Sequence, residues 1–134
     1  MKLVRILGGL VAVLLLLVVG YFVMAESGEV VVLETRDAAG AHSTRVWVVD
    51  DAGFAWLRTG DPASPWLARL RTDPEVAVTR AGERREYRAV LLGDAATRDR
   101  INALTLEKYG TAEKILRALM MDPSGVTPIR LEPR

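Results

Sequence analysis

An uninterrupted apolar run opens the chain. Residues 6–25 contain no charged side chain, and they follow a short basic start that holds Lys2 and Arg5. A helix of this length covers about 30 Å, the hydrocarbon thickness of a bilayer, and a helix satisfies its own backbone polar groups in lipid. We therefore predict a transmembrane anchor over residues 1–26 that contacts the membrane through residues 6–25.

The alternative for this segment is a cleaved signal peptide. Val23 and Ala25 are small enough for a cut after Ala25, which would leave a secreted protein. The apolar run is longer than the usual ~7–15 residues of a signal peptide, which favours the uncleaved anchor. Lys2 and Arg5 precede the run and the next basic residue is Arg36, so the positive-inside rule predicts a cytoplasmic amino terminus in the cell membrane, with the domain outside.

Residues 27–134 show a different pattern, in which short β-branched or alternating runs are separated by small and polar residues. Such runs are typical of half-buried strands joined by turns. Six strands are predicted, at residues 29–36, 42–49, 54–58, 75–80, 83–92 and 126–131. Short turns join the first three, which favours an antiparallel meander.

Three helices interrupt these strands. The first is short, at residues 66–71, with Ser64 as its capping residue and Pro65 at its first position. A helical pair follows: residues 95–109, between an Asp94 N-cap and Gly110, and residues 111–121. The last helix has a stripe of apolar residues at Ile115, Leu116, Leu119 and Met120. The fold class is therefore α+β, mainly β, with six antiparallel strands closed into a small barrel to hide their edges.

Composition excludes several functions for residues 27–134. This region carries 16 basic and 16 acidic residues, and a neutral domain argues against nonspecific nucleic-acid binding. There is no cysteine and a single histidine, His42, so we predict no metal site. His42 lies beside a turn and is expected to be exposed. Glu107 and Glu113 are expected to be ordinary helix charges.

Three places carry candidate chemistry. A predicted strand ends at Arg58, Thr59 and Gly60. The forked donor of the arginine, the threonine hydroxyl and the accessible backbone of the glycine suit a phosphate group. The alternative is simply a strand end followed by a turn. Arg45 and Trp47 share a strand face and suit a planar anion; alternatively Trp47 is core and Arg45 lies over it. Trp66 either walls a pocket or packs its helix onto the sheet.

These residues belong to a longer pattern that resembles a known family. The matching segments are residues 33–36, Gly40, 45–50, 58–60, 66–67, 70–78 and 128–133. The most informative is Trp66 followed by Leu70-Arg71-Thr72-Asp73-Pro74-Glu75-Val76. Together they resemble the deazaflavin-dependent nitroreductase-like proteins of the FMN-binding split β-barrel superfamily, whose fold is like that of the pyridoxamine-phosphate oxidases. The resemblance implies a split-barrel domain over residues 27–134.

The resemblance also implies a function. It predicts a deazaflavin coenzyme or FMN as cofactor and hydride transfer to a quinone- or nitro-type acceptor, with the cofactor supplying the chemistry. Arg58, Thr59 and Gly60 match the motif that holds the cofactor phosphate, Arg45 the basic residue of the second strand, and Trp66 the helix-start tryptophan. A homodimer is a further expectation. Because the first hairpin turn carries Asp37 where the family has basic residues, a cofactor-free binding or scaffold module at the membrane is the alternative.

Overall fold

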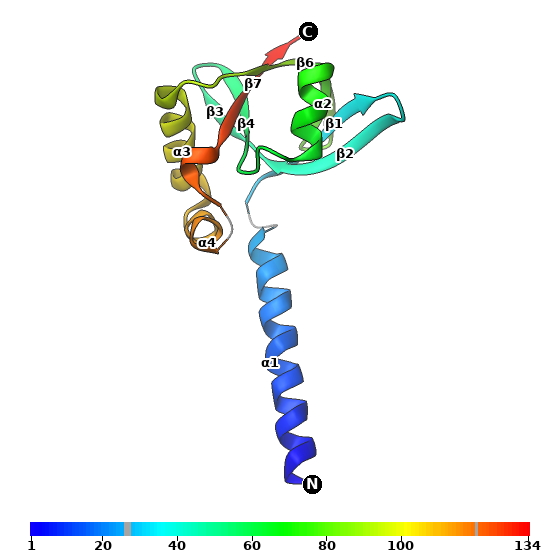
Figure 1. The fold of residues 1–134 in the computed structure, drawn as a ribbon, viewed down its shortest axis with the longest axis vertical. Coiled ribbons are helices and arrows are strands. Elements are labelled where there is room, and N and C mark those ends of the chain that lie inside the picture. Colours follow the sequence, from blue (N-terminus) through cyan, green and yellow to red (C-terminus); the bar gives the residue numbers. More distant parts are fainter. Residues whose placement is uncertain (26–27, 120) are drawn as a thin grey trace.

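The computed structural model describes residues 1–25, 28–119 and 121–134, so the predicted domain boundary at residues 26–27 and the apolar position 120 lie outside the described residues. The first helix, α1 (Lys2–Ala25), extends away from the rest of the molecule (Figure 1). Its first part, Lys2–Gly20, is long and apolar enough to cross a membrane, and none of it is buried against the domain. A signal sequence passes the same test, so α1 is either a span or such a signal.

The remaining chain builds one curled antiparallel sheet of seven strands. Their bounds are β1 (Val30–Asp37), β2 (Gly40–Trp47), β3 (Val49–Asp51), β4 (Phe54–Thr59), β5 (Glu75–Arg80), β6 (Glu83–Leu91) and β7 (Thr127–Pro133). The spatial order is β2-β1-β5-β6-β7-β4-β3, and every neighbouring pair is antiparallel. The α+β class and the antiparallel curled sheet agree with the prediction from sequence.

The predicted count of six strands and the predicted meander are wrong, and Val48 explains both. The expected strand 42–49 is split there into β2, which pairs with β1, and β3, which pairs with β4. The Val48 amide donates to the Tyr109 hydroxyl at 3.0 Å and its carbonyl accepts from the Lys108 ammonium at 2.8 Å. Because these bonds satisfy Val48 outside the sheet, the chain passes at this residue from one edge of the sheet to the other. The two edges therefore meet, and the sheet curls.

The main core lies between the curled sheet and α2 (Pro65–Thr72), which presents Trp66, Leu67 and Leu70 to it. Figure 1 shows this helix on the side of the sheet near β1 and β2. Ser64 is at the N-cap position, but its side chain makes no capping bond, contrary to expectation. Its hydroxyl instead lies 3.1 Å from that of Thr59, and both residues are buried.

Two further helices, α3 (Ala95–Tyr109) and α4 (Thr111–Leu119), lie on the other side of the sheet, followed by the short 3-10 helix η1 (Pro123–Gly125). The Asp94 side chain accepts from the Thr97 amide, as its predicted N-cap role requires. Gly110 ends α3 with a positive φ of 53°, also as predicted. A second core cluster lies beneath α3 and consists of Val49, Trp56, Ile101 and Tyr109.

The chain enters the domain beside the junction of α3 and α4. Gly28 has a φ of 80° and lies so close to the Tyr109 ring that a Cβ would come within 2.7 Å of it. The Tyr109 hydroxyl lies 2.6 Å from the Glu29 carbonyl oxygen, and the Lys108 ammonium lies 2.7 Å from the Glu29 carboxylate. Gly28 and Glu29, which follow α1, are thus fixed to the end of α3.

Candidate functional site

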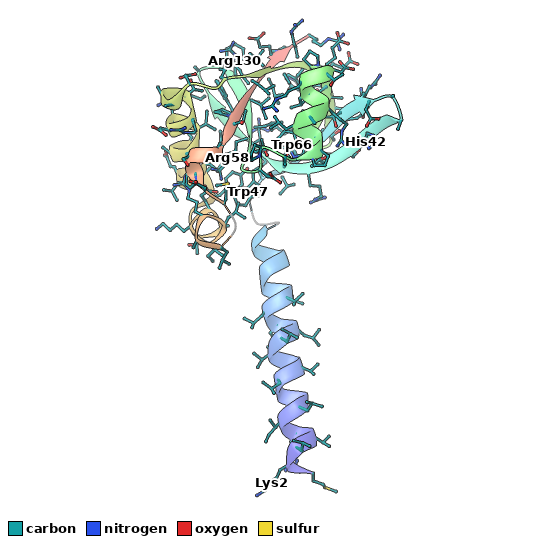
Figure 2. The ribbon with its side chains drawn as sticks, in the orientation of Figure 1. Lys2, His42, Trp47, Arg58, Trp66 and Arg130 are labelled. Atoms are coloured by element: carbon teal, nitrogen blue, oxygen red, sulfur yellow. The ribbon has the colours of Figure 1, made fainter. Side chains whose placement is uncertain are left out.

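A cavity of about 480 Å³ brings together all six residues that the sequence predicts for cofactor binding. These are Arg45 and Trp47 from β2, Arg58 and Thr59 from β4, Gly60 from the next loop and Trp66 from α2. Val30, Leu116 and Met121 complete much of the wall, so the lining is largely apolar. Figure 2 shows Trp47 and Arg58 at the end of the domain from which α1 leaves.

Arg58 is engaged by a carboxylate of the chain itself. Its side chain is 6% exposed and its guanidinium pairs with Glu113 of α4, whose side chain is fully buried. Arg58 also donates to the Asn102 side-chain oxygen at 2.8 Å, and Arg117 binds the second oxygen of Glu113 at 2.6 Å. Burial lowers the pKa of Arg58, and the attraction of Glu113 opposes that shift. Arg58 therefore belongs to a buried ionic cluster that joins β4 to α3 and α4.

Thr59 and Gly60 also contact other groups of the chain. The Thr59 hydroxyl lies 3.0 Å from the Asp61 carbonyl oxygen, to which it donates, and it contacts Ser64. A Cβ at Gly60 would overlap the Met121 side chain, so this glycine permits a close approach within the protein. Arg58 and Thr59 both line the cavity, but each side chain is already bonded to other groups of the chain.

The aromatic wall of the cavity is fixed from behind. The Trp47 ring stacks on the Tyr109 ring, with centroids 4.2 Å apart and an interplanar angle of 7°. Trp66 is buried with the core residues beneath α2, while it also lines the cavity. Arg45, on an exposed part of β2, contributes a positive charge at the edge. Because Asp61 also lines the cavity, the charges at its edge have both signs, and the aromatic walls suit a flat, apolar molecule.

The cavity as built does not fit a cofactor phosphate at the predicted motif. The guanidinium that would receive the phosphate holds Glu113, and the hydroxyl beside it is bonded within its own loop. Among the described residues, no buried side-chain nitrogen or oxygen lacks a hydrogen-bond partner. Binding a dianion at Arg58 would require the displacement of a fully buried carboxylate.

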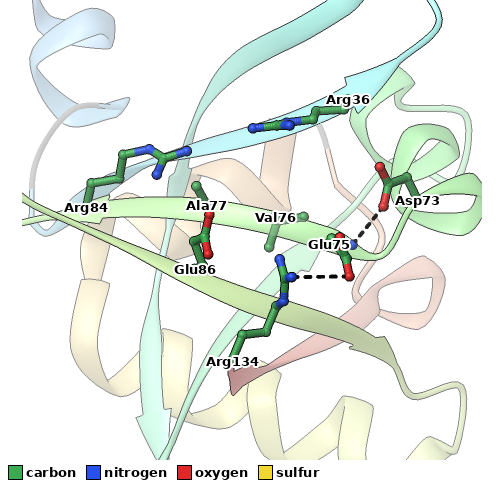
Figure 3. Close-up of a pocket in the computed structure, with 8 residues that line it drawn as sticks. All are labelled: Arg36, Asp73, Glu75, Val76, Ala77, Arg84, Glu86 and Arg134. Atoms are coloured by element: carbon green, nitrogen blue, oxygen red, sulfur yellow. Dashed lines mark hydrogen bonds and ion pairs between the residues drawn. The ribbon is translucent and has the colours of Figure 1, made fainter.

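A second, smaller hollow is lined by acidic and basic side chains that neutralise one another (Figure 3). It holds about 70 Å³ and is lined mainly by charged side chains of both signs. Arg134 lies 3.3 Å from Glu75, and the Glu75 amide donates to Asp73 at 3.1 Å. The hollow is small and its charges neutralise one another, so it offers little to a ligand.

Two residues that contact the lining of the larger cavity were missed by the sequence-based prediction. Glu113 was expected to be an ordinary helix charge but is fully buried, and Tyr109 had no assigned role. A signal for Glu113 exists: it lies three positions before Leu116, next to the apolar stripe of its helix. His42, expected to be exposed, is half-buried and lies 2.9 Å from Asp37 across the first hairpin.

The sequence matches no protein-family model and no curated protein. Solved structures do resemble it. A provisionally assigned pyridoxamine 5′-phosphate oxidase from Listeria innocua has 18% identity and a TM-score of 0.59, covering 84% of this chain and 90% of that one. A NimC/NimA family protein from Clostridium acetobutylicum has 15% identity and a TM-score of 0.58, covering 81% and 76%. The heme storage protein HutZ from Vibrio cholerae has 17% identity and a TM-score of 0.61, covering 83% and 85%. The chain therefore has the split-barrel fold of these proteins.

Proposed function

We propose that this chain is a membrane-anchored split-barrel protein that binds a flat, lipophilic small molecule of the quinone type, without a flavin held at Arg58. The observation that carries the proposal is the buried Glu113, which binds the guanidinium of the arginine that a phosphate would need. The rest of the lining includes Trp47, Trp66 and Leu116, together with Arg45 and Asp61, whose charges have opposite signs. The aromatic and aliphatic walls suit a flat quinone ring.

The membrane is part of this proposal. α1 acts as an uncleaved anchor, with the amino terminus in the cytoplasm and the domain on the outer side. The length and composition of α1 support the anchor, and Lys2 and Arg5 support the orientation. A lipophilic ligand is concentrated in the bilayer next to such a domain. Protease treatment of intact cells tests the orientation, since only an outward-facing domain is digested while the membrane is closed.

A second candidate function is the flavin- or deazaflavin-dependent reductase that the family resemblance implies, acting on a quinone- or nitro-type acceptor. The specific observation in its favour is that all six implied cofactor residues line one cavity. Under this alternative the phosphate must bind away from Arg58. A homodimer, in which a second copy adds residues to the cavity, remains a proposal for either function.

Tryptophan fluorescence of the full chain in lipid nanodiscs separates the two candidates. We would titrate the protein with a short-chain naphthoquinone, with FMN and with a deazaflavin coenzyme. The binding-module proposal expects saturable quenching by the naphthoquinone alone. Saturable binding of FMN or of the deazaflavin would favour the reductase, and the absence of any binding would overturn both.

The three tryptophans provide matched controls for this titration. Trp47 and Trp66 line the cavity, whereas Trp56 is buried beneath α3 and donates to the Asp51 carbonyl oxygen at 3.3 Å. Trp47→Phe and Trp66→Phe should each remove part of the quenching. Trp56→Phe should leave the quenched component intact, because both cavity rings remain. Equal loss in all three variants would contradict binding in this cavity.

A further inference from the structure

An apolar strip of α4 is left uncovered by the domain. Leu119 is 69% exposed, and among the described residues after α1 it is the one large apolar side chain that is so exposed. Ile115 lies one helical turn before it and is half-buried. The domain covers Ala112 and Glu113 instead, on a neighbouring part of the helix surface. The apolar face of α4 is therefore wider than the part that packs against the protein.

The covalent chain holds α4 close to the end of α1. Only residues 26 and 27 separate Ala25 from Gly28, and three steps of about 3.8 Å allow the two Cα atoms at most ~11 Å of separation. Gly28 lies against the Tyr109 ring, and Glu29 is bonded to Tyr109 and Lys108. α4 begins two residues after Tyr109. The start of α4 is thus tied to the point where a membrane-spanning α1 would leave the bilayer.

The arrangement of the two helices is that expected at a membrane surface. In Figure 1, α1 runs along the page whereas α4 is seen end-on, level with the domain-side end of α1. A helix that lies crosswise to a spanning helix lies in the plane of the bilayer surface. Such interfacial helices combine an apolar side with basic residues. In α4 the exposed Lys114 supplies such a charge, whereas Arg117 binds Glu113 within the domain.

We propose that α4 is a membrane-docking helix that inserts Leu119 and Ile115 into the headgroup region of the bilayer that α1 spans. The occupant of the uncovered strip is lipid, because the bilayer is the apolar phase that the tether brings to it. Leu116 and Met121 also line the cavity, so docking places one wall of the cavity against the membrane. The proposal rests on the proposed function, specifically on α1 being an uncleaved anchor.

The full chain permits a direct test, because it has no cysteine and any single cysteine introduced is unique. Leu119→Cys, Leu14→Cys and Ala96→Cys would each be labelled with a small fluorophore and reconstituted into vesicles of phosphatidylcholine and phosphatidylglycerol. Nitroxide lipids that carry the spin label at the headgroup or deep in the acyl chain then report the depth of each fluorophore. Leu14 lies within the apolar part of α1, and Ala96 is exposed at the opposite end of α3 from Tyr109.

Docking predicts a distinct result for each position. The label at position 14 loses its fluorescence to the deep nitroxide, the label at 119 loses it to the shallow nitroxide, and the label at 96 keeps it with both. If position 14 is quenched while 119 behaves like 96, docking is overturned and the anchor stands. If position 14 is not quenched, the anchor itself fails, and the proposed membrane function fails with docking.

A protein surface covering α4 gives a different pattern. The label at position 119 would then be shielded from iodide in the water but would not be quenched by either nitroxide lipid. That outcome overturns lipid docking in favour of a second copy of the chain or another protein. Because Leu119 is exposed, Leu119→Cys should leave unfolding of the domain unchanged, and an altered unfolding midpoint would show that the side chain packs within the protein.

Discussion

Two arginine-centred ionic clusters hold this domain together, and they differ in how much water reaches them. Arg58 and Glu113 are shielded almost completely, in contact with Asn102 and Arg117. Arg80 is about one-third exposed, and its guanidinium binds Glu29 at 2.8 Å and Asp50 at 2.7 Å. The first cluster joins a strand to the helical pair, and the second joins the start of β1 to β3 and β5.

The contrast separates the effect of burial from the effect of pairing. Burial is the main influence on Arg58 and lowers its pKa, whereas the hydrogen bonds that Arg80 donates to Asp50 and Glu29 raise the pKa of Arg80. A buried charge that loses its partner has no water to replace it, while an exposed one is rehydrated. The two clusters should therefore respond very differently to loss of one partner.

The largest effect is expected at the buried cluster. Glu113→Gln keeps the shape of the side chain but leaves the Arg58 charge without a counterion. Breaking a buried pair in this way costs about 3–5 kcal/mol of unfolding free energy. Urea unfolding of the full chain in detergent micelles measures this loss of unfolding free energy.

A double variant sharpens this prediction. Arg58→Met with Glu113→Leu removes the two most buried charges together and should recover much of the lost stability, because the charge that then loses its partner, Arg117, is 25% exposed and can be hydrated. A loss in Glu113→Gln no larger than that of an exposed pair would mean that water reaches this cluster.

A smaller effect is expected where the two clusters approach each other, at Tyr109. Tyr109→Phe removes the hydroxyl that accepts from the Val48 amide at 3.0 Å and lies 2.6 Å from the Glu29 carbonyl oxygen. Leaving a buried amide unsatisfied should cost about 1–3 kcal/mol. Tyr87→Phe is the matched control, since the Tyr87 hydroxyl makes no hydrogen bond to the parts of the chain that the structure describes. Equal losses in the two variants would argue against a specific role for the Tyr109 hydroxyl.

The exposed cluster should contribute less, and in a pH-dependent way. Arg80→Ala is expected to cost about 1 kcal/mol at neutral pH, because solvent screens its ion pairs. Hydrogen bonds from Arg80 lower the pKa of Glu29 from 4.5 and that of Asp50 from 3.8. Their contribution is fully present above those ordinary values and is lost as the pH falls through the lower values of the folded protein.

Unfolding of the wild type and of Arg80→Ala at pH 7 and pH 3 tests this pH dependence. The wild type should lose more stability on acidification than the variant, so the difference between them narrows at low pH. A difference that is constant across this range would show that packing of the Arg80 side chain, and not its charge, stabilises the fold.

The smallest effect is expected at the tip of the first hairpin. Asp37 bonds His42 at 2.9 Å, which lowers the pKa of Asp37, but both side chains are 39% exposed, so water screens the pair. Asp37→Asn should leave the unfolding midpoint within experimental error. A clear loss would show that this turn is held more tightly than its exposure indicates.

The elements that sequence patterns predicted well are those whose signals are local. The apolar run of α1, the alternation of β5, and the Asp94 cap and Gly110 end of α3 are all readable within a few residues. The division between β2 and β3 is not local, because Tyr109 and Lys108 satisfy Val48 from about 60 positions away. Hydrophobic periodicity therefore predicts one long strand there.

The candidate site divides in the same way. The types of residue at strand ends and at a helix start were enough to predict the six residues that line the cavity. The hydrogen bonds and ion pairs of their side chains, however, depend on partners far away in the sequence. Arg58 is a residue of the type that binds phosphate. Only the packing of α4 shows that its guanidinium is bound by Glu113, 55 positions later. The Ser64 side chain likewise bonds Thr59 and leaves its helix uncapped. Long-range pairing of polar groups is the part that periodicity does not encode.

The close contact between Gly28 and Tyr109, at the entry to the domain, has a consequence for how the protein would meet a ligand. A domain on a long flexible linker can move through a large volume of solution, whereas this domain is attached only a few residues after the end of α1. With α1 in a bilayer, its reach is confined to a thin layer of water along the membrane. Encounters with a bilayer-dissolved molecule then occur by lateral diffusion in two dimensions, and their rate depends on the surface density of that molecule.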